Sequence, residues 1–272
     1  MIVNIAFILN KTAQKRIYLF MLKEERQQYI LNKLSEADRV TSLELSKELN
    51  VSDDTIRRDL KILADEGLIL KVHGGAIPKP SAPISYLERL NYEEHKKIAL
   101  AKHLTPFIKS DMVLLIDGGT TNLIAVKQFP RNISLTVVTN SIPVAAELSS
   151  YANVEIIMLG GNILKSSQVT VGIEAIESLD GIYADLCLMG TCSLHSDLGL
   201  TSTNKDESML KKRMIDSSKK VLLMATNDKL ETASNFKVCE TEAINYLIPE
   251  ESADSLILAK LEKKGIEIIN NS

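Results

Sequence analysis

The segment at residues 40–76 constrains this chain most, because it fits two short amphipathic helices, a tight turn and a small hairpin into fewer residues than an enzyme core needs. Leu45 and Leu49 lie one helical turn apart, and Asn50 can adopt the left-handed conformation that ends a helix. Ser52 is then a good N-cap, and two Asp residues follow it, where the helix dipole favours negative charge. A second helix is therefore predicted to start there.

The second helix has one apolar face and one polar face. Ile56, Leu60 and Leu63 fall at i, i+4 and i+7 and form a buried stripe. Gly67 ends the helix, and residues 68–72 are predicted to form a strand that leads into a turn. Arg side chains match guanine edges, and hydroxyls bond phosphates or bases. The residues predicted to contact DNA are Ser52, Thr55, Arg57, Arg58, Lys61, Lys71, His73 and Gly74, with Gly75 completing the turn.

The run S-D-D-T-I-R-R-D-L, followed by E-G-L-I-L and V-H-G-G-A, resembles the winged helix-turn-helix of the DeoR-type family of bacterial sugar-metabolism regulators. The resemblance implies binding to double-stranded operator DNA; an ordinary helical hairpin is the alternative. Residues 21–77 carry nine Lys and Arg against eleven Asp and Glu, so one copy attracts DNA only weakly. We therefore expect a homo-oligomer, either a dimer or a tetramer.

The length of 272 residues allows a small module and a larger domain with its own core. No apolar run approaches the roughly 18 residues of a membrane span. The three cysteines, Cys187, Cys192 and Cys239, lack the paired spacing of metal ligands. We therefore expect a cytoplasmic protein without membrane contact, with reduced thiols and with no bound metal.

Four divisions of the chain are predicted. Residues 1–20 are an extension, 21–77 the DNA-binding module, 78–92 a Pro-punctuated linker and 93–272 an effector-sensing domain. In the extension the cations follow the apolar run, whereas a secretory signal carries them before it. Either Met21 is the natural start, or the extension adds nothing to the fold.

The larger domain alternates short apolar strands with amphipathic helices, beginning with a helix from Glu93 to Lys109. Strands are expected at Met112–Ile116, Leu135–Val138, Val154–Leu159, Leu186–Met189, Val221–Met224, Tyr246–Ile248 and Ile266–Ile269. Their almost continuous apolar character indicates burial on both faces. The predicted fold class is α/β: an N-terminal winged helix-turn-helix followed by an open, mostly parallel sheet with helices.

Polar and glycine residues follow several of these strands, where such sheets bind ligands. The run Gly118-Gly119-Thr120-Thr121 offers open backbone, hydroxyls and a helix start, which suits a phosphate. Neither G-x-x-x-x-G-K-[ST] nor G-x-G-x-x-G is present, so no nucleotide cofactor is expected. The residues predicted to bind a small anionic ligand are Asp117, Gly118, Gly119, Thr120, Thr121, Asn140, Ser141, Gly161, Glu207 and Lys229.

The order I-D-G-G-T-T, V-V-T-N-S, L-G-G and G-L-T-S-T is similar to the sensor domain of the same family, which is related to the ribose-5-phosphate isomerase fold. The resemblance implies a phosphorylated sugar whose phosphate lies at residues 118–121, with Asn140, Glu207 and Lys229 lining the rest. The chain departs from the family at Thr226, where an Asp is usual, and at residues 190–193. The identity of the sugar is left open by these departures.

Two classes of function fit these patterns. One is a regulator, a repressor released by a phosphorylated sugar; the other is a sugar-phosphate isomerase with an appended DNA-binding module. Asp117, Asp185 and Glu207 are candidate general bases, but a carboxylate in a pocket binds hydroxyls equally well. His195, near Asp197, is expected to be a solvated loop residue. No catalytic residue is predicted, because the DNA-binding pattern is stronger than any catalytic constellation.

Overall fold

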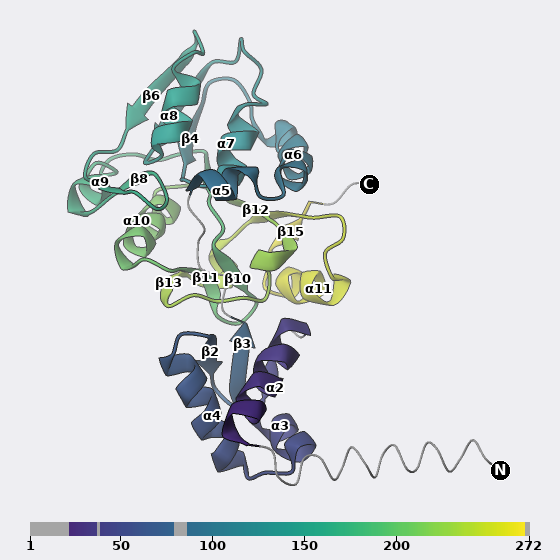
Figure 1. Ribbon diagram of the computed structural model, residues 1–272. Helices are drawn as coiled ribbons and strands as arrows, with labels where there is room; N and C mark the ends of the chain where they lie inside the picture. The colour runs from purple at the N-terminus through teal and green to yellow at the C-terminus, as the bar shows by residue number, and fades with distance from the viewer. Residues whose placement is uncertain (1–21, 37–38, 79–85, 270–272) are drawn as a thin grey trace, which may run out of the picture. The chain divides into compact units, whose positions relative to one another are not determined.

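The computed structural model describes residues 22–36, 39–78 and 86–269 (Figure 1). The predictions for residues 1–20 and for a start at Met21 lie outside these ranges. The chain divides into two compact units near residue 79, and each has its own apolar core.

The small unit combines helices with a three-stranded antiparallel sheet in the order β1-β3-β2. The predicted stripe of Ile56, Leu60 and Leu63 is buried and packs with Ile30 and Leu45 of the two neighbouring helices. The elements are α2 (Lys23–Glu36), β1 (Val40–Thr41), α3 (Ser42–Leu49), α4 (Asp53–Asp65), β2 (Ile69–Val72) and β3 (Gly75–Pro78).

The predicted helix ends are confirmed at three positions. Asn50 closes α3 in the left-handed region, with φ of 52°. The hydroxyl of Ser52 accepts a hydrogen bond from the amide of Thr55 at 3.1 Å and so caps α4. Gly67 follows the end of α4 with φ of 72°, a conformation that favours glycine. Each of these ends is set by residues close in sequence.

The hairpin after α4 differs from its prediction at both ends of β3. Gly75 belongs to this strand, and a Cβ there would lie 2.0 Å from the carbonyl oxygen of Val40, so β1 can approach only a glycine. Pro78, predicted to begin the linker, pairs instead with Ile69 of β2. Proline is tolerated because β1 covers only the start of β3, at Gly75 and Ala76.

The large unit is built on a seven-stranded parallel sheet in the order β15-β14-β12-β9-β4-β5-β6, which confirms the predicted open parallel sheet. Its first strand in the chain, β4, lies inside the sheet; the chain then adds strands on one side before returning to the other. The strands are β4 (Met112–Ile116), β5 (Leu135–Thr139), β6 (Val154–Met158), β9 (Leu186–Met189), β12 (Val221–Ala225), β14 (Tyr246–Pro249) and β15 (Glu267–Ile268).

Helices cover both faces of this sheet. Alternate residues of β4 show the two sides: Leu114 packs in the cluster that includes α6, α7 and α8, and Leu115 packs in the cluster that includes α9, α10 and α11. The bounds are α5 (Tyr86–Asn91), α6 (Glu94–Lys102), α7 (Thr120–Val126), α8 (Ile142–Leu148), α9 (Ile173–Glu177), α10 (Lys205–Asp216) and α11 (Ser255–Lys263). Burial of both faces explains why the central strands are apolar throughout.

Three details of the large unit differ from the predictions. The helix expected to reach Lys109 ends at Lys102, and a 3-10 turn at Thr105–Phe107 follows, because Pro106 cannot continue an α-helix. The helix α5 lies within the predicted linker, of which residues 79–85 are outside the described ranges. Strand β6 is an edge strand, and Ile157 and Met158 are each 39% exposed.

Short strands missing from the prediction form two further sheets, the hairpin β7-β8 and the sheet β10-β11-β13. Their bounds are β7 (Asn162–Leu164), β8 (Val169–Val171), β10 (Ser193–His195), β11 (Gly199–Ser202) and β13 (Phe236–Cys239). The prediction of a solvated His195 is wrong: it ends β10, is 6% exposed and lies 3.9 Å from Glu231. Their lengths of three or four residues are too short for a periodicity argument.

Candidate functional site

The outer face of α4 carries two exposed arginines. The side chains of Arg57 and Arg58 are 63% and 78% exposed, and they pair with Asp53 at 2.7 Å and Asp54 at 2.6 Å. Exposed pairs of this i,i+4 kind contribute only about 0.3–0.5 kcal/mol. Both guanidinium groups can therefore exchange their aspartates for a phosphate or a base edge at small cost.

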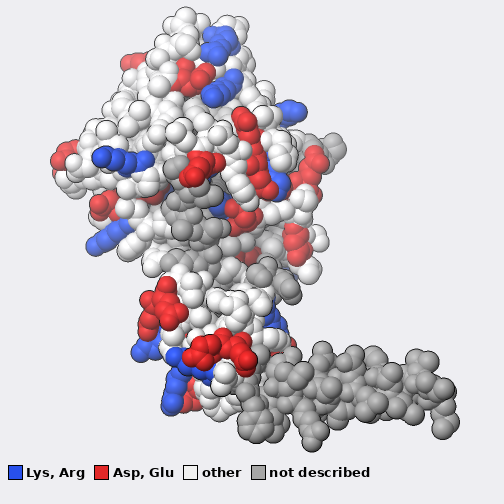
Figure 2. Space-filling view, viewed as in Figure 1, with Lys and Arg blue, Asp and Glu red and all other residues white. Residues whose placement is uncertain are grey.

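The other predicted DNA contacts also lie on the surface of the small unit. Lys61, Lys71 and His73 are exposed, and Thr55 is half-buried. The hydroxyl of Ser52 lies 2.8 Å from that of Thr55, so these two are held together at the start of α4. Figure 2 shows cations and anions side by side on the visible face of this unit, in agreement with its nearly balanced charge.

The turn before β3 is fixed to the start of α3. The carbonyl of Gly74 accepts hydrogen bonds from the amide of Ser42 at 2.8 Å and from its hydroxyl at 3.2 Å. Gly74 has φ of 80°, and no atom lies within 4 Å of the position that its Cβ would take. The tip of the turn is therefore held in place and open to contact.

An ion pair that the sequence analysis did not identify joins α4 to α2. The Nε atom of Arg26 lies 2.5 Å from Oδ2 of Asp59, and the Asp59 side chain is 3% exposed. Asp59 lies one turn after Ile56, on the buried side of α4, and that position was the available signal. The pair ties α4 to α2 within the small unit.

The large unit contains a cavity of about 300 Å³ at the carboxyl ends of its central strands. β4 and β9 are neighbours at the point where the order of strands reverses, and open α/β sheets bind ligands at such points. The volume is at the lower end of the range of about 300–1,000 Å³ for small-molecule sites. The lining residues come from α5, α6, α7, α10, the β7-β8 hairpin and the loops after β4, β9, β11 and β12.

Glycines allow the loops after β4 and β9 to meet beside the cavity. A Cβ on Gly190 would lie 2.2 Å from the carbonyl oxygen of Gly118, and one on Gly118 would lie 2.2 Å from Cγ1 of Val169. Gly119 precedes α7 with φ of 130°. The backbone, with Thr120 and Thr121, therefore forms part of the cavity wall without bulky side chains in front of it.

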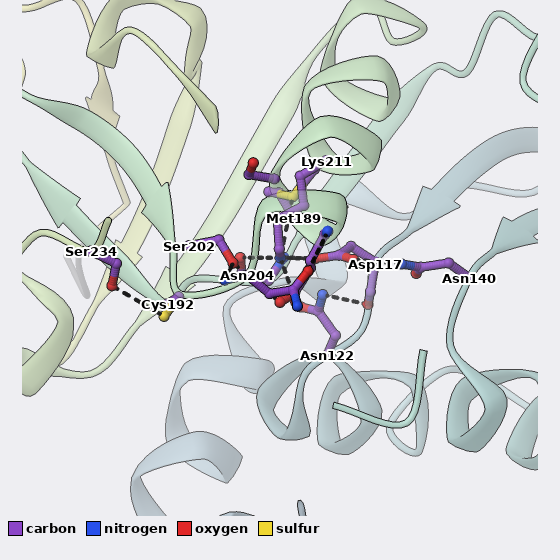
Figure 3. A network of polar contacts seen from close by, with 12 residues as sticks. Asp117, Asn122, Asn140, Met189, Cys192, Ser202, Asn204, Lys211 and Ser234 are labelled. Atoms are coloured by element: carbon purple, nitrogen blue, oxygen red, sulfur yellow. Dashed lines mark hydrogen bonds and ion pairs between the residues drawn. The ribbon is translucent and has the colours of Figure 1, made fainter. Parts of the chain in front are cut away.

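A buried network lies behind this wall (Figure 3). The ammonium of Lys211 pairs with Oδ2 of Asp117 and donates to the carbonyl of Gly190 at 2.9 Å. Asp117 also accepts from the amide of Gly190 at 3.0 Å and from Nδ2 of Asn140 at 3.1 Å. Burial lowers the pKa of Lys211, but the carboxylates of Asp117 and Glu207 outweigh it and raise that pKa overall. Lys211 is therefore a charged group that holds the two loops together.

Cations gather in another part of the wall. Lys97 is 6% exposed and donates to the carbonyl of Arg89, whose Nη2 donates to the carbonyl of Ser166 at 2.7 Å. Burial lowers the pKa of Lys97, and the positive charges of Lys229 and Arg89 lower it further, against the carboxylate of Asp228. An anion placed here would relieve that repulsion, so the cavity favours a negatively charged ligand.

The structure separates the predicted ligand residues into two groups. Gly118, Gly119, Thr120, Thr121, Glu207 and Lys229 line the cavity. Asp117, Asn140, Ser141 and Gly161 are not among its lining residues. The first three of these are fully buried behind it, and Ser141 caps α8. Direct ligand contact by these four is therefore not supported. The carboxylate of Asp117, Nδ2 of Asn140 and the hydroxyl of Ser141 make hydrogen bonds within the protein, whereas Oδ1 of Asn140 is buried without a hydrogen-bond partner.

Lining residues that the sequence analysis missed include Arg89, Lys97, Thr191, Asp228 and Lys211. Arg89 was assigned to the linker, and Lys97 lies on the helix predicted to start at Glu93 but was not singled out. Lys211 follows Glu207 by four residues on α10, at 3.7 Å, and this spacing was the one usable signal. The others meet only through the folded chain.

Comparisons with known proteins agree with this two-part arrangement. Residues 26–80 match the model of the DeoR-like helix-turn-helix domain, and residues 91–251 match that of the DeoR C terminal sensor domain. Within the described ranges, no helix is both long enough and apolar enough to span a membrane.

Curated relatives match along nearly the whole chain. The HTH-type transcriptional regulator GolR of Listeria innocua is 30% identical, over 91% of this chain and 98% of the relative. The HTH-type transcriptional repressor GlcR of Bacillus subtilis is 31% identical, over 92% and 96%. Among solved structures, the sorbitol operon regulator SorC of Klebsiella pneumoniae has a TM-score of 0.43 at 12% identity, over 86% of this chain and 98% of that one.

Proposed function

The chain belongs to the DeoR family of transcriptional regulators, and from this premise we propose that it represses a carbohydrate-metabolism operon until a phosphorylated sugar or related metabolite binds its cavity. Like its relatives, which are named transcriptional regulators, it is a DNA-binding regulator and not an enzyme. The protein acts in the cytoplasm, where the operator lies.

The proposed DNA contact is the exposed face of α4 with the turn between β2 and β3. Arg57 and Arg58 are held only by exposed ion pairs, so base or phosphate contacts can replace those pairs. The charge of residues 21–77 gives one copy little general attraction to DNA. Two copies on one operator supply the missing affinity, and a dimer or tetramer is therefore part of the proposal.

The observation that carries the effector class is the cluster of cations in the cavity wall. Lys97 is buried near Lys229 and Arg89; burial lowers its pKa most, and the positive charges of Lys229 and Arg89 lower it further, an electrostatic effect that a bound anion would oppose. Glu207 and Asp228 in the same wall are acceptors for hydroxyl groups. A small ligand with a phosphate and several hydroxyls satisfies both kinds of group.

Effector binding and DNA binding are coupled as two ligands of one equilibrium. An effector that binds the DNA-free state more tightly lowers operator occupancy, and the operator weakens effector binding by the same factor. Couplings of this kind usually amount to about 1–3 kcal/mol.

The test uses the full chain in two assays. Thermal shift with a panel of phosphorylated sugars identifies a ligand, because a ligand that binds only the folded state raises the melting temperature. DNA selected from a random pool then serves in a mobility-shift assay with and without that ligand. We expect the ligand to release the DNA.

Thr120→Ala provides the discriminating variant. Thr120 lines the cavity and begins α7, so its loss should weaken the response to the ligand and leave binding to DNA intact. Simultaneous loss of both would indicate misfolding. Turnover of a sugar phosphate by the pure protein, or selection of no DNA sequence, would contradict the proposal.

A further inference from the structure

A carboxylate, that of Asp228, lies in the loop that follows β12. Thr226, Asp228 and Lys229 all line the cavity. The 3-10 turn Asn227–Lys229 brings these side chains to one part of the wall.

Asp228 is held from two directions. Its Oδ1 accepts a hydrogen bond from the hydroxyl of Thr226 at 2.5 Å, and its Oδ2 lies 2.6 Å from the ammonium of Lys229. The Asp228 side chain is still 42% exposed, so its oxygens keep free lone pairs on the open side. The protein thus orients this carboxylate and leaves it accessible.

The same contacts keep Asp228 ionised. Partial burial by itself raises the pKa of Asp228, but the charge of Lys229 and the hydrogen bonds from Lys229 and Thr226 outweigh it and lower that pKa. An ionised carboxylate only accepts hydrogen bonds. It therefore suits a ligand hydroxyl and repels a phosphate.

Thr226 and Asp228 form a matched pair. Because their side-chain oxygens are 2.5 Å apart, an Asp at position 226 would place two carboxylates in contact, and one of them could not ionise. A hydroxyl at 226 donates instead. Thr226 is 8% exposed, so its part is to position Asp228.

We propose that Asp228, positioned by Thr226, determines effector specificity by accepting a hydrogen bond from a hydroxyl group of the bound sugar phosphate. This inference rests on the proposed function and adds the residue that distinguishes a hydroxylated effector from a bare anion. The phosphate is expected at the cations of the wall, Arg89 and Lys97; the carboxylates of Asp228 and Glu93 offset part of the positive charge of Lys97.

The test compares two classes of probe with the full-length protein. The sugar phosphates are glucose 6-phosphate, fructose 6-phosphate, ribose 5-phosphate and glycerol 3-phosphate, and the bare anion is inorganic phosphate. Asp228→Asn should weaken the best sugar phosphate at least about tenfold, the factor carried by a hydrogen bond to a charged group. It should leave inorganic phosphate binding unchanged or tighter, because a negative charge is removed from the wall.

Thr226→Val and Thr226→Ser test the positioning role. Valine has nearly the shape of threonine and lacks the donor, so it should weaken the sugar phosphate and not inorganic phosphate, whereas serine keeps the donor and should restore binding. Asp180→Asn is the matched control, since Asp180 pairs with Arg213 at 2.6 Å and does not line the cavity. Circular dichroism and operator binding without ligand confirm that each variant is folded.

The outcomes separate this inference from the proposed function. If the wild type binds a sugar phosphate and Asp228→Asn binds it equally well, the inference is wrong and the proposed function stands. Equal weakening of the sugar phosphate and inorganic phosphate also overturns it. A wild type that responds to none of the sugar phosphates overturns both.

Discussion

Two cation–carboxylate pairs in this molecule have the same chemistry and opposite surroundings. Arg58 and Asp54 on α4 are 78% and 69% exposed, while Lys211, which lines the cavity, and Asp117 behind it are 4% and 0% exposed. Water competes with the first pair and screens it, so it contributes little to stability and its arginine remains free to bind elsewhere. Water does not compete with the second pair, and loss of either partner leaves the other as a buried charge without a counter-charge. Exposure therefore decides which cation is available for recognition and which holds the fold.

The largest expected effect comes from breaking the buried pair. Lys211→Met leaves Asp117 buried without its counter-charge and should lower the free energy of unfolding by about 3–5 kcal/mol. Urea unfolding followed by circular dichroism measures the loss. Lys212→Met, at an exposed neighbour on α10, is the matched control and should change stability by less than about 0.5 kcal/mol. A loss below about 1 kcal/mol for Lys211→Met would contradict the role assigned to this pair.

An intermediate effect is expected for the pair between α2 and α4. Asp59→Asn keeps the shape of the side chain and removes its charge, so the contact with Arg26 weakens by about 1.5–3 kcal/mol. Asp54→Asn on the exposed face of α4 is the comparison and should lie within about 0.5 kcal/mol of the wild type. Equal losses in the two variants would mean that burial does not distinguish these aspartates.

The exposed pair should show its effect on DNA rather than on stability. Arg58→Ala should weaken binding to the selected DNA by about 1–3 kcal/mol if Arg58 makes a bidentate base contact. Its unfolding free energy should change by no more than about 0.5 kcal/mol. A mobility-shift titration measures the affinity, with Asp54→Asn as the variant that frees the arginine. Unchanged affinity in Arg58→Ala would exclude Arg58 as a reader of the operator.

The smallest effect concerns Lys97, which is buried like Lys211 but has two cations, Lys229 and Arg89, as well as the carboxylates of Asp228 and Glu93 acting on it. Its pKa is lowered by burial and then by Lys229 and Arg89, so the unfolded chain binds the proton more tightly than the folded protein. The contribution of Lys97 to stability therefore rises as the pH increases from the pKa of Lys97 in the folded protein toward its pKa in the unfolded chain, about 10.4. Lys97→Met should change stability at neutral pH by less than about 1 kcal/mol and remove this rise.

Urea titrations of the wild type and of Lys97→Met at two pH values test whether stability rises with pH. Because the other groups titrate alike in both proteins, the difference between them isolates the contribution of Lys97. Lys102→Met, at an exposed position at the end of the same helix, is the control. Lys97→Met should also lose the rise in melting temperature that inorganic phosphate causes. A variant that keeps both the pH dependence and the phosphate response would show that Lys97 does not form the anion site.

The sequence by itself determined the elements whose signals are local. The stripe of Ile56, Leu60 and Leu63, the cap at Ser52 and the left-handed Asn50 fixed the helices of the small unit, because a helix end depends on residues within one turn. The parallel strands were predictable for a similar reason, since burial on both faces requires an apolar run. The loop at residues 118–121 could be placed because it follows such a strand directly.

Only the tertiary structure decided which polar residues share the cavity. Arg89 and Lys97 precede the sheet in sequence, and Thr191 and Asp228 follow different strands, so no spacing relates them. Asp117 looked like a ligand contact from its position after β4, yet Lys211, 94 residues later, and Asn140 occupy its carboxylate. Whether a charged group binds a partner or supports the fold depends on what surrounds it in space. Those surroundings come from the order of strands in the sheet, which local sequence does not encode.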